Sequence, residues 1–453
     1  LRARRPRSAP MIDADLAIVD AAELVTVRGG TPRRGAAQGD LGIIERGCLA
    51  AREGRIVFVG DERDYRRQVR LLRQGIEIDA TGRTVLPGFV DPHTHLPFAG
   101  SREREFEQRL RGASYEEIAE RGGGILSTVE ATRRASYDAL VELGKARLNR
   151  MLLHGTTTAE AKSGYGLTLD DELKQLRVLR ALDSIHPIDV VPTFLGAHTV
   201  PRERRHEREA YVREIVERMI PAVAREGLAR FCDVFVEEIA FTPQEAERVL
   251  KAAAAQGLGL RVHADQLRDG GGAALAARLG AASADHLEHT GEEGIRALAA
   301  SGTDAVLLPG AAFFMRHRPA GLGRRLVDAR VPVALATDFN PGTCPTEAMT
   351  AILPLACLDD GLSPAEAIVA ATLNAAHALG LAERIGSLEA GKEADVQVLD
   401  VPNHLHLVYH FGVNHCRTVV KRGRVVVEEG AIAGTAGGPL SGNGATDKPS
   451  GGF

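Results

Sequence analysis

The chain has no run of about 18 consecutive apolar residues, so we expect no segment that crosses a membrane. It also has no surplus of charge of one sign, because 56 Lys and Arg residues face 60 Asp and Glu, a net charge of −4 at pH 7. That balance excludes a general electrostatic attraction to nucleic acid or to an anionic membrane surface. We therefore expect neither nucleic acid nor a membrane among its partners.

Cysteines are few and widely spaced, and no CxxC pair is present; the five are Cys48, Cys232, Cys344, Cys357 and Cys416. An odd number at such spacing is typical of reduced thiols rather than a disulfide framework. The N-terminal stretch LRARRPRSAP is basic, but no apolar segment follows it, so it does not read as a secretory signal. These observations predict a cytoplasmic protein.

The two ends of the chain share a sequence pattern that is typical of β-strands. Residues 12–86 and 386–432 consist of short apolar runs separated by glycine and aspartate, which is typical of strands joined by turns. The EGRI and TGRT stretches suit hairpin turns, where glycine accepts a positive φ. We predict one small β-sandwich domain built from both segments. Residues 1–11 and the Gly-rich residues 433–453 are expected to be disordered tails.

The central block, residues 87–385, alternates apolar strand-like runs with helix-like segments. The expected strands are residues 86–93, 155–161, 189–197, 231–237, 259–265, 281–287, 304–308 and 332–337. The expected helices include residues 170–182, 208–227, 242–257, 269–280, 292–302 and 363–380. Eight strands that are each followed by a helix predict an α/β fold, a (β/α)₈ TIM-like barrel. In that fold the active site lies at the carboxyl ends of the strands.

The first barrel strand ends in the sequence Asp-Pro-His-Thr-His, and its two histidines are the starting point for a metal site. Residues two apart on a strand share a face, so His93 and His95 are expected to point the same way. An HxH pair alone is common by chance. The later strands strengthen the metal interpretation, because several of them also end in a titratable side chain.

His263 ends the fifth strand and Asp338 ends the eighth. A single strand histidine is more often a hydrogen-bonded core residue, and Asp338 could simply cap the turn that follows it. A metal explains both better, because burying a carboxylate without a cation costs several kcal/mol. Three imidazoles and one carboxylate suit a single Zn²⁺, Fe²⁺ or Fe³⁺ ion, which would lower the pKa of a bound water towards ~7.

Two further residues at strand ends bear on proton transfer. His286 ends the sixth strand, and its usual pKa suits an acid or base near neutral pH, so we predict that it transfers protons with Asp338. Gln266 has no titratable proton and can only hydrogen-bond the substrate, which argues against ring deamination. Lys162 follows the second strand; a carboxylated lysine that bridges two metals is the less favoured interpretation there.

Several residues in the loops above the strands are candidates for substrate contacts. An arginine above the first strand can clamp a carboxylate in a bidentate fork, which most surface arginines do not do. The loop after Asp338 is rich in main-chain donors. The candidates are Arg102, Tyr115, Tyr165, His198, Gln266, Asn340, Gly342 and Thr343.

The ordered motifs DPHTHLPFAGSRE, AKSGYG, LGAHTV, HADQL, SADHLEH and TDFNPGT resemble the imidazolonepropionase family of the amidohydrolase superfamily. The resemblance covers the chain apart from its tails. It implies metal-dependent hydrolysis of 4-imidazolone-5-propanoate to N-formimino-L-glutamate, the third step of histidine degradation. Some members of the family carry glutamate where Gln266 stands, so a general-acid role is not transferred to that position.

The resemblance also implies a distribution of roles. The metal ligands would be His93, His95, His263 and Asp338; Arg102, Tyr165 and His198 would contact the substrate; Asn340, Gly342 and Thr343 would hold the ring-opened product. The alternatives are another cyclic amidohydrolase or ring deaminase on the same barrel, and a non-catalytic scaffold that kept the fold. A homodimer is expected from the frequency of such assemblies.

Overall fold

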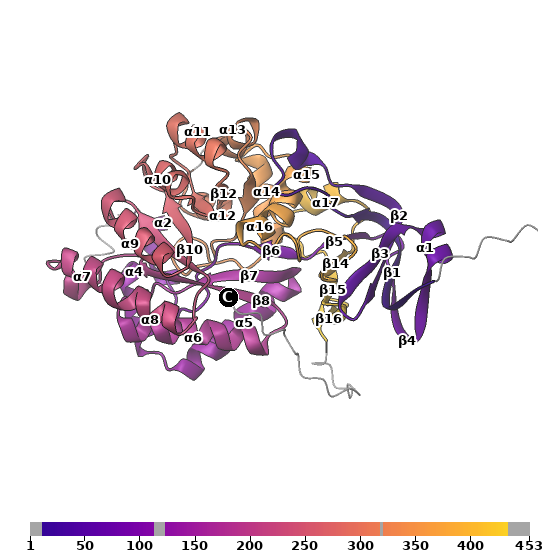
Figure 1. Cartoon of the computed structure of the whole chain (residues 1–453), viewed down its shortest axis with the longest axis horizontal. Coiled ribbons are helices and arrows are strands. Elements are labelled where there is room, and N and C mark those ends of the chain that lie inside the picture. The colour runs from indigo at the N-terminus through magenta and orange to yellow at the C-terminus, as the bar shows by residue number, and fades with distance from the viewer. Residues whose placement is uncertain (1–10, 113–122, 318–319, 434–453) are drawn as a thin grey trace, which may run out of the picture.

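The computed structural model describes residues 11–112, 123–317 and 320–433. These residues form two sheets, a helix-covered parallel sheet and a mixed sheet that lies at one side of it (Figure 1). Within the described residues, no helix has the length and apolar character that a bilayer crossing requires.

The parallel sheet has eight strands in sequence order, as expected for the barrel. Its strands are β6 (Phe89–Asp91), β7 (Thr156–Lys162), β8 (Asp189–Ala197), β9 (Phe231–Val236), β10 (Gly259–Ala264), β11 (Ser283–His286), β12 (Asp304–Leu307) and β13 (Val333–Leu335). They coincide with the eight predicted segments. These strands are buried almost throughout, which explains why they read as continuous apolar runs in the sequence.

The ring between the last and first strands closes just beyond the strand ends. Thr94 and Phe339 form an isolated parallel bridge. The amide of Asp338 donates to the carbonyl of His93 at 3.1 Å, and the amide of His95 donates to the carbonyl of Phe339 at 2.9 Å. The closure therefore brings together the two loops that carry three of the four predicted metal ligands, His93, His95 and Asp338.

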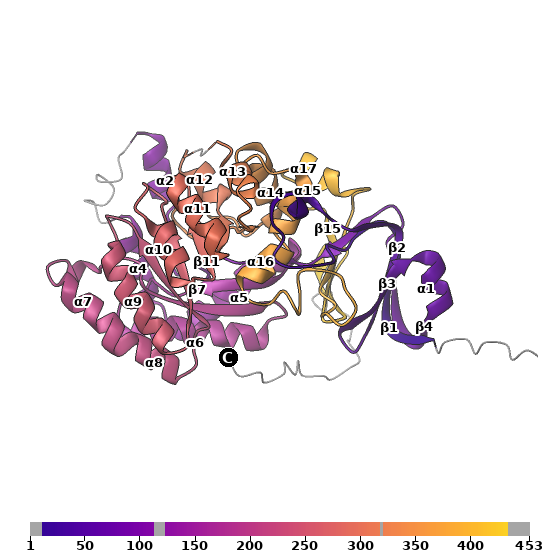
Figure 2. The same cartoon turned by 45° about the horizontal axis from the view of Figure 1, so that its top comes forward.

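Helices surround the sheet and connect its strands (Figures 1 and 2). The first connection contains α2 (Glu103–Leu110), α4 (Ile125–Arg134) and α5 (Tyr137–Leu153). Later connections contain α6 (Leu169–Ile185), α7 (Arg208–Glu214), the π-helical turn Ile215–Met219, α8 (Ile220–Arg225), α9 (Pro243–Ala255), α10 (Gly272–Leu279), α11 (Glu292–Ser301), α12 (Pro309–Phe314) and α13 (Leu322–Asp328). Helix α9 begins with a full capping box between Thr242 and Glu245.

The predicted helix over residues 363–380 is wrong in one respect, because it is interrupted. It forms α15 (Pro364–Ala370) and α16 (Leu373–Ala378), separated at Thr372, where φ is −129° and ψ is −90°. The carbonyl of Ala371 accepts a hydrogen bond from the amide of Val90 at 3.0 Å. The break thus gives the first barrel strand a backbone partner that a continuous helix would have used internally.

The mixed sheet is built from both ends of the chain, as predicted. Its nine strands are β1 (Ile12–Val25), β2 (Ile43–Arg52), β3 (Arg55–Asp61), β4 (Val69–Asp79), β5 (Thr84–Pro87), β14 (Val396–Leu399), β15 (Cys416–Lys421), β16 (Arg424–Glu428) and β17 (Ala431–Ile432). β5 pairs with β1 on one side and with β14 on the other, so the N- and C-terminal strands meet there. The remaining helices are α1 (Glu62–Gln68), which precedes β4, α14 (Met349–Leu358), which follows β13 of the barrel, and α17 (His404–Tyr409), which lies between β14 and β15 in the chain.

The two predicted hairpin turns have different outcomes. The EGRI turn joins the antiparallel strands β2 and β3, with φ of 52° at Glu53 and 81° at Gly54. The TGRT turn is not a hairpin, because β4 and β5, the strands it connects, both run parallel to β1. Local glycine chemistry indicated the turn correctly, but the pairing of its flanking strands depends on the distant β1.

Candidate active site

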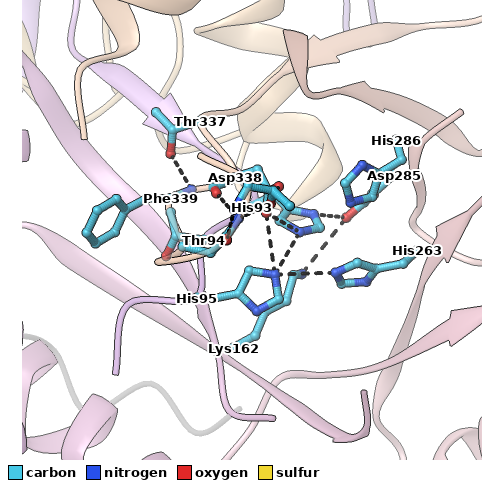
Figure 3. Close-up of polar contacts among 12 residues, drawn as sticks. His93, Thr94, His95, Lys162, His263, Asp285, His286, Thr337, Asp338 and Phe339 are labelled. Atoms are coloured by element: carbon cyan, nitrogen blue, oxygen red, sulfur yellow. Dashed lines mark hydrogen bonds and ion pairs between the residues drawn. The ribbon is translucent and has the colours of Figure 1, made fainter. Parts of the chain in front are cut away.

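Four side chains meet at the carboxyl end of the barrel (Figure 3). Nε2 of His95 lies 3.3 Å from Nε2 of His93 and 3.4 Å from Nε2 of His263. Oδ1 of Asp338 lies 3.5 Å from the Nε2 atoms of both His93 and His95. All four residues are at most 3% exposed. The structure therefore gathers residues from β6, β10 and β13, and their following loops, around one point.

These distances suit a shared metal ion. Bonds of about 2.1 Å to a tetrahedral ion place its ligand atoms roughly 3.4 Å apart. Oδ1 of Asp338, the oxygen that faces the imidazoles, has no hydrogen-bond partner among the described residues although it is buried. A buried carboxylate oxygen without a donor is costly, and a cation would satisfy it. The donor set therefore fits a metal.

His286 extends this cluster. One group of atoms close enough to hold an ion consists of His93, His95 and Asp338, and a second consists of His93, His263 and His286. The His286 ring centroid is 5.6 Å from that of His93 and 5.4 Å from that of His263. His286 thus borders the site that the other four residues define.

Burial controls the protonation of the imidazoles that face the ion site. Desolvation, reinforced by the Lys162 ammonium, holds the pKa of His93 well below its usual value. Burial likewise holds the pKa of His95 well below its usual value and lowers that of His263. Neutral imidazoles offer the lone pairs that a metal requires.

The pKa values of Asp338 and His286, the two predicted proton carriers, are raised. Burial raises the pKa of the Asp338 carboxyl to about 7, although His286 and Asn340 oppose this rise. Burial opposes protonation of His286, but the carboxylate of Glu288, whose Oε1 lies 3.3 Å from Nδ1, helps to raise its pKa overall. A carboxyl with a pKa of about 7 can change protonation state near neutral pH, and the raised pKa of His286 favours its protonated form.

The loop after Asp338 is organised by Asn340. Its Oδ1 accepts hydrogen bonds from the amides of Gly342 and Thr343, both at 2.8 Å. Its Nδ2 donates to the carbonyl of Asp338 and to Oγ1 of Thr343, both at 2.7 Å. The main-chain donors that the sequence suggested for a ligand are thus engaged with Asn340, which makes this loop a preformed turn.

His198 and Tyr165 form one wall of the site. The His198 ring stacks on the His95 ring with centroids 5.1 Å apart. The centroid of the Tyr165 ring lies 5.9 Å from that of His95. Nδ1 of His198 donates to the carbonyl of Gly164 at 2.9 Å, which leaves Nε2 as an acceptor. Burial lowers the pKa of His198 to about 3 and raises that of Tyr165. Both side chains are neutral hydrogen-bonding groups.

Arg102 enters the site from the N-terminus of α2. Its Nε donates to Oε2 of Glu105 at 2.7 Å, and its guanidinium lies against Gly342. Helix α2 lies beside α12 (Figure 2), where Phe106 stacks on Phe314 with centroids 4.7 Å apart. This packing holds Arg102 over the loop that follows Asp338.

Gln266 and Tyr115 are the other two residues that were predicted to contact the substrate. Gln266 lies just beyond β10, where its Nε2 is 4.0 Å from Sδ of Met315. Tyr115 falls in residues 113–122, outside the described part of the chain.

Lys162 forms ion pairs with carboxylates of β7 and β9. Its ammonium is completely buried, 2.8 Å from Oε1 of Glu160 and 2.9 Å from Oδ2 of Asp233. Those ion pairs account for the residue without a second metal.

The structure also reveals polar residues beneath the site that the sequence interpretation passed over. Asp285 lies 2.6 Å from Nδ1 of His93, Asp233 lies 3.0 Å from Nδ1 of His263, and Arg261 donates to Asp285 at 2.9 Å. Each interrupts an otherwise apolar strand. That interruption was an available signal, because a charge in a buried strand requires a partner.

Comparison with known proteins identifies relatives along nearly the whole chain. A family model described as the amidohydrolase family matches residues 77–123 and 120–427. An imidazolonepropionase from Symbiobacterium thermophilum is 56% identical over 423 residues, covering 93% of this chain and 99% of that protein. An imidazolonepropionase from Geobacillus kaustophilus is 52% identical over 415 residues, covering 91% and 98%.

Solved structures with the same fold are more distant in sequence. An adenosine deaminase from Xanthomonas campestris with bound zinc superposes with a TM-score of 0.68 at 18% identity, covering 94% of this chain and 95% of that one. The atrazine chlorohydrolase TrzN from Arthrobacter aurescens, complexed with zinc, gives a TM-score of 0.65 at 19% identity, covering 92% and 96%. At such identities the likeness establishes the fold alone.

Proposed function

The chain belongs to the amidohydrolase family and, within it, to the imidazolonepropionases, and from this premise we propose how its residues carry out that activity. The reaction is the metal-dependent hydrolysis of 4-imidazolone-5-propanoate to N-formimino-L-glutamate in histidine degradation. Water adds to the ring carbonyl carbon, the bond from that carbon to the ring nitrogen breaks, and the nitrogen gains a proton. The observation that carries the assignment of residues is the convergence of four buried donor atoms at separations of 3.3–3.5 Å.

We propose that His93, His95, His263 and Asp338 hold one zinc or iron ion. Imidazole nitrogen and carboxylate oxygen are ligands that both metals accept. When bound, the ion supplies Lewis acidity and lowers the pKa of water towards ~7. The unpartnered Oδ1 of Asp338 faces the imidazoles and is the carboxylate oxygen suited to the ion.

Asp338 and His286 are the proposed proton carriers. Asp338 accepts the proton of the attacking water at Oδ2, the oxygen that faces Oγ1 of Thr343 at 3.4 Å, and returns it to the leaving ring nitrogen. Protonated His286 donates a hydrogen bond to the ring carbonyl oxygen as negative charge develops there. The raised pKa of His286 suits its role as a protonated hydrogen-bond donor.

The remaining side chains bind and orient the substrate. Arg102 and the Tyr165 hydroxyl anchor the propionate, since a guanidinium pairs with a carboxylate in two hydrogen bonds. His198 offers Nε2 as an acceptor for a ring N–H group, because its Nδ1 is committed to Gly164. Gln266 contributes hydrogen bonds only.

The product-binding role is assigned to the turn after Asp338. Asn340 holds the turn together, Gly342 lies against Arg102, and Thr343 places its hydroxyl beside Asp338. The ring-opened product carries a second carboxylate, and the preformed turn presents polar groups beside the place where it arises. Tyr115 is proposed as an additional contact from the sequence alone.

Elemental analysis combined with a substrate assay tests this assignment. Purified protein should contain about one zinc or iron ion per chain and should remove the absorbance of imidazolone propanoate. The His263→Ala variant should fold, lose its metal and lose turnover. His206→Ala, at an exposed histidine, is the matched control and should retain both. A metal-free His263→Ala protein with full activity would refute the assignment.

We further propose a cytoplasmic homodimer. The five cysteines form no disulfide. Large apolar side chains are exposed on and just beyond α17, at Leu405, Tyr409, Phe411 and Val413. Light scattering after size-exclusion chromatography should give twice the chain mass, and the double substitution Tyr409→Ser with Phe411→Ser should shift it towards the monomer.

A further inference from the structure

Five charged side chains lie beneath the proposed ion site, and we call them the barrel charge cluster. They come from β7 and from the three adjacent strands β9, β10 and β11, and all are completely buried. Three are carboxylates and two are cations. The cluster consists of Glu160, Lys162, Asp233, Arg261 and Asp285.

Two carboxylates of the barrel charge cluster contact the proposed ligand imidazoles from behind. Oδ2 of Asp285 lies 2.6 Å from Nδ1 of His93, and Oδ2 of Asp233 lies 3.0 Å from Nδ1 of His263. An N–H at Nδ1 that faces a carboxylate leaves the lone pair on Nε2, the nitrogen that faces the ion site. Asp233 and Asp285 therefore determine which nitrogen each imidazole presents.

Lys162 connects these two carboxylates, and Figure 3 shows it together with Asp285. Its Nζ is 2.9 Å from the same Oδ2 of Asp233 that faces His263. It is also 3.9 Å from the same Oδ2 of Asp285 that faces His93, and 2.8 Å from Oε1 of Glu160. One ammonium thus lies next to both Asp233 and Asp285, the carboxylates that face two of the proposed ligand histidines.

The two cations of the cluster are not equivalent. Arg261 donates to Asp285 at 2.9 Å and to the carbonyl of Pro92 at 2.7 Å. Among the described residues, Lys162 is the lysine or arginine that approaches Asp233 within ion-pair distance. Without it, Asp233 would be a buried anion whose remaining partners are the uncharged His263 imidazole and the His263 amide, which donates to its Oδ1 at 3.2 Å. A buried anion without a cation either moves or takes up a proton.

This arrangement argues against a carboxylated lysine. Carboxylation would turn the ammonium into an anion surrounded by Glu160, Asp233 and Asp285, and like charges at these distances repel strongly in a buried site. The cationic form balances the carboxylates instead.

We propose that Lys162 is a positioning residue for the metal centre: its ammonium holds Asp233 and Asp285 so that His263 and His93 both present Nε2 to the same ion. The proposal rests on the ligand assignment under the proposed function. Lys162 itself touches neither the substrate nor the ion.

The test measures metal affinity rather than turnover. Zinc affinity of the full-length protein is determined by competition with a chromophoric chelator, and cobalt(II) is substituted to record its visible absorption spectrum. Lys162→Met should bind zinc about 10- to 100-fold more weakly than the wild type, the usual cost of removing a group that supports metal ligands. Its cobalt spectrum should change, because one ligand histidine loses its fixed orientation. Wild-type affinity and an unchanged spectrum would overturn the proposal.

Lys421→Met is the matched control. Lys421 is also a buried lysine between two carboxylates, with Nζ 3.0 Å from Asp189 and 2.6 Å from Asp395, but it belongs to β15 in the other sheet. Its loss should lower the unfolding temperature without altering zinc affinity or the cobalt spectrum. An equal loss of zinc affinity in both variants would show a general effect of destabilisation and would overturn the specific role of Lys162.

A double-mutant cycle with Asp233→Asn gives a second route if Lys162→Met does not fold. In the variant that carries both substitutions, the Lys162–Asp233 pair is removed as a unit, so neither of these two charges is left without the other, while Glu160 loses its ammonium as it does in Lys162→Met alone. If Lys162 acts through Asp233, this double variant should bind zinc no more weakly than Asp233→Asn alone. Additive losses, or wild-type affinity in the double variant, would contradict the proposal.

The His263→Ala variant distinguishes a failure of the metal-ligand assignment from a failure of the positioning role of Lys162. If His263→Ala loses zinc while Lys162→Met retains wild-type affinity, the ligand assignment stands and the positioning role fails. If His263→Ala also retains wild-type affinity, the ligand assignment itself is wrong.

Discussion

The guanidinium of Arg102 lies directly against the Cα of Gly342, so that a Cβ built on Gly342 would overlap Nη1 and lie 2.9 Å from Cζ. The two residues come from opposite ends of the barrel sequence, and their contact joins the proposed propionate anchor to the turn after Asp338. Nearby, Nη2 of Arg109 donates to the carbonyl of Gly342 at 3.1 Å. Glycine is required here by close approach, which ties the shape of this turn to the position of the arginine.

Gly342→Ala should therefore displace Arg102 and raise KM for imidazolone propanoate. Loss of a well-placed charged hydrogen bond costs about 1.5–3 kcal/mol, which corresponds to a roughly 10- to 100-fold higher KM. The free energy of unfolding should change little, because the flexible end of an arginine side chain can move. Steady-state kinetics check this, with Gly30→Ala as the control, since a Cβ at Gly30 meets nothing within 4 Å. An unchanged KM in Gly342→Ala would show that the arginine position does not matter for binding.

Arg102→Met should raise KM by a similar factor while metal content stays at the wild-type level. The substitution removes both hydrogen bonds to the propionate but lies outside the ion site. Arg104→Met, at the neighbouring exposed arginine, should leave KM unchanged. If Arg102→Met shows the wild-type KM, the carboxylate anchor lies elsewhere.

The buried carboxyl of Asp360, just after α14, should make the protein less stable as pH rises. Burial and the nearby Glu288 and Asp359 carboxylates raise its pKa from 3.8 to about 8. Between these two values the unfolded chain has released the proton while the folded chain retains it. Raising the pH therefore favours unfolding across this window, by on the order of a few kcal/mol in total.

Asp360→Asn removes this titration and should lose that part of the pH dependence. Its unfolding temperature should match that of the wild type near pH 4 and exceed it increasingly towards pH 8, as measured by calorimetry on metal-loaded protein. The same pH slope in both proteins would count against a raised pKa at Asp360.

Removal of the metal with a chelator should lower the unfolding temperature. A ligand that binds only the folded state stabilises it by about 2.7–4.1 kcal/mol at 100 to 1,000 times its Kd. Zinc added back should restore the original transition in differential scanning fluorimetry. The His263→Ala protein should show no change on chelation; a shift as large as that of the wild type would place the stabilising ion outside the proposed site.

Much of the fold could be predicted because it depends on local pattern. Each barrel strand is a short buried run, and the structure has all eight where the pattern placed them. The interruption of the helix at Thr372 was not predictable in this way. It depends on a hydrogen bond between Ala371 and Val90, which are far apart in sequence.

The same difference between local pattern and long-range contact applies to the candidate site. Histidines after strands marked the ion site, because strand ends are visible in the sequence. Asp285 was overlooked although it precedes His286, since its partner His93 is 192 residues away. Lys162 suggested a metal ligand by its residue type, whereas the structure pairs it with carboxylates from other strands.

The sequence by itself determined which donor types end which strands, because side-chain alternation and strand length are properties of the local backbone. Only the tertiary structure decided which atoms face one another. The ring closes through Thr94 and Phe339, and that closure sets the distance between Asp338 and the two histidines of the first strand. Distances across the barrel depend on the packing of all eight strands, so no single segment contains them.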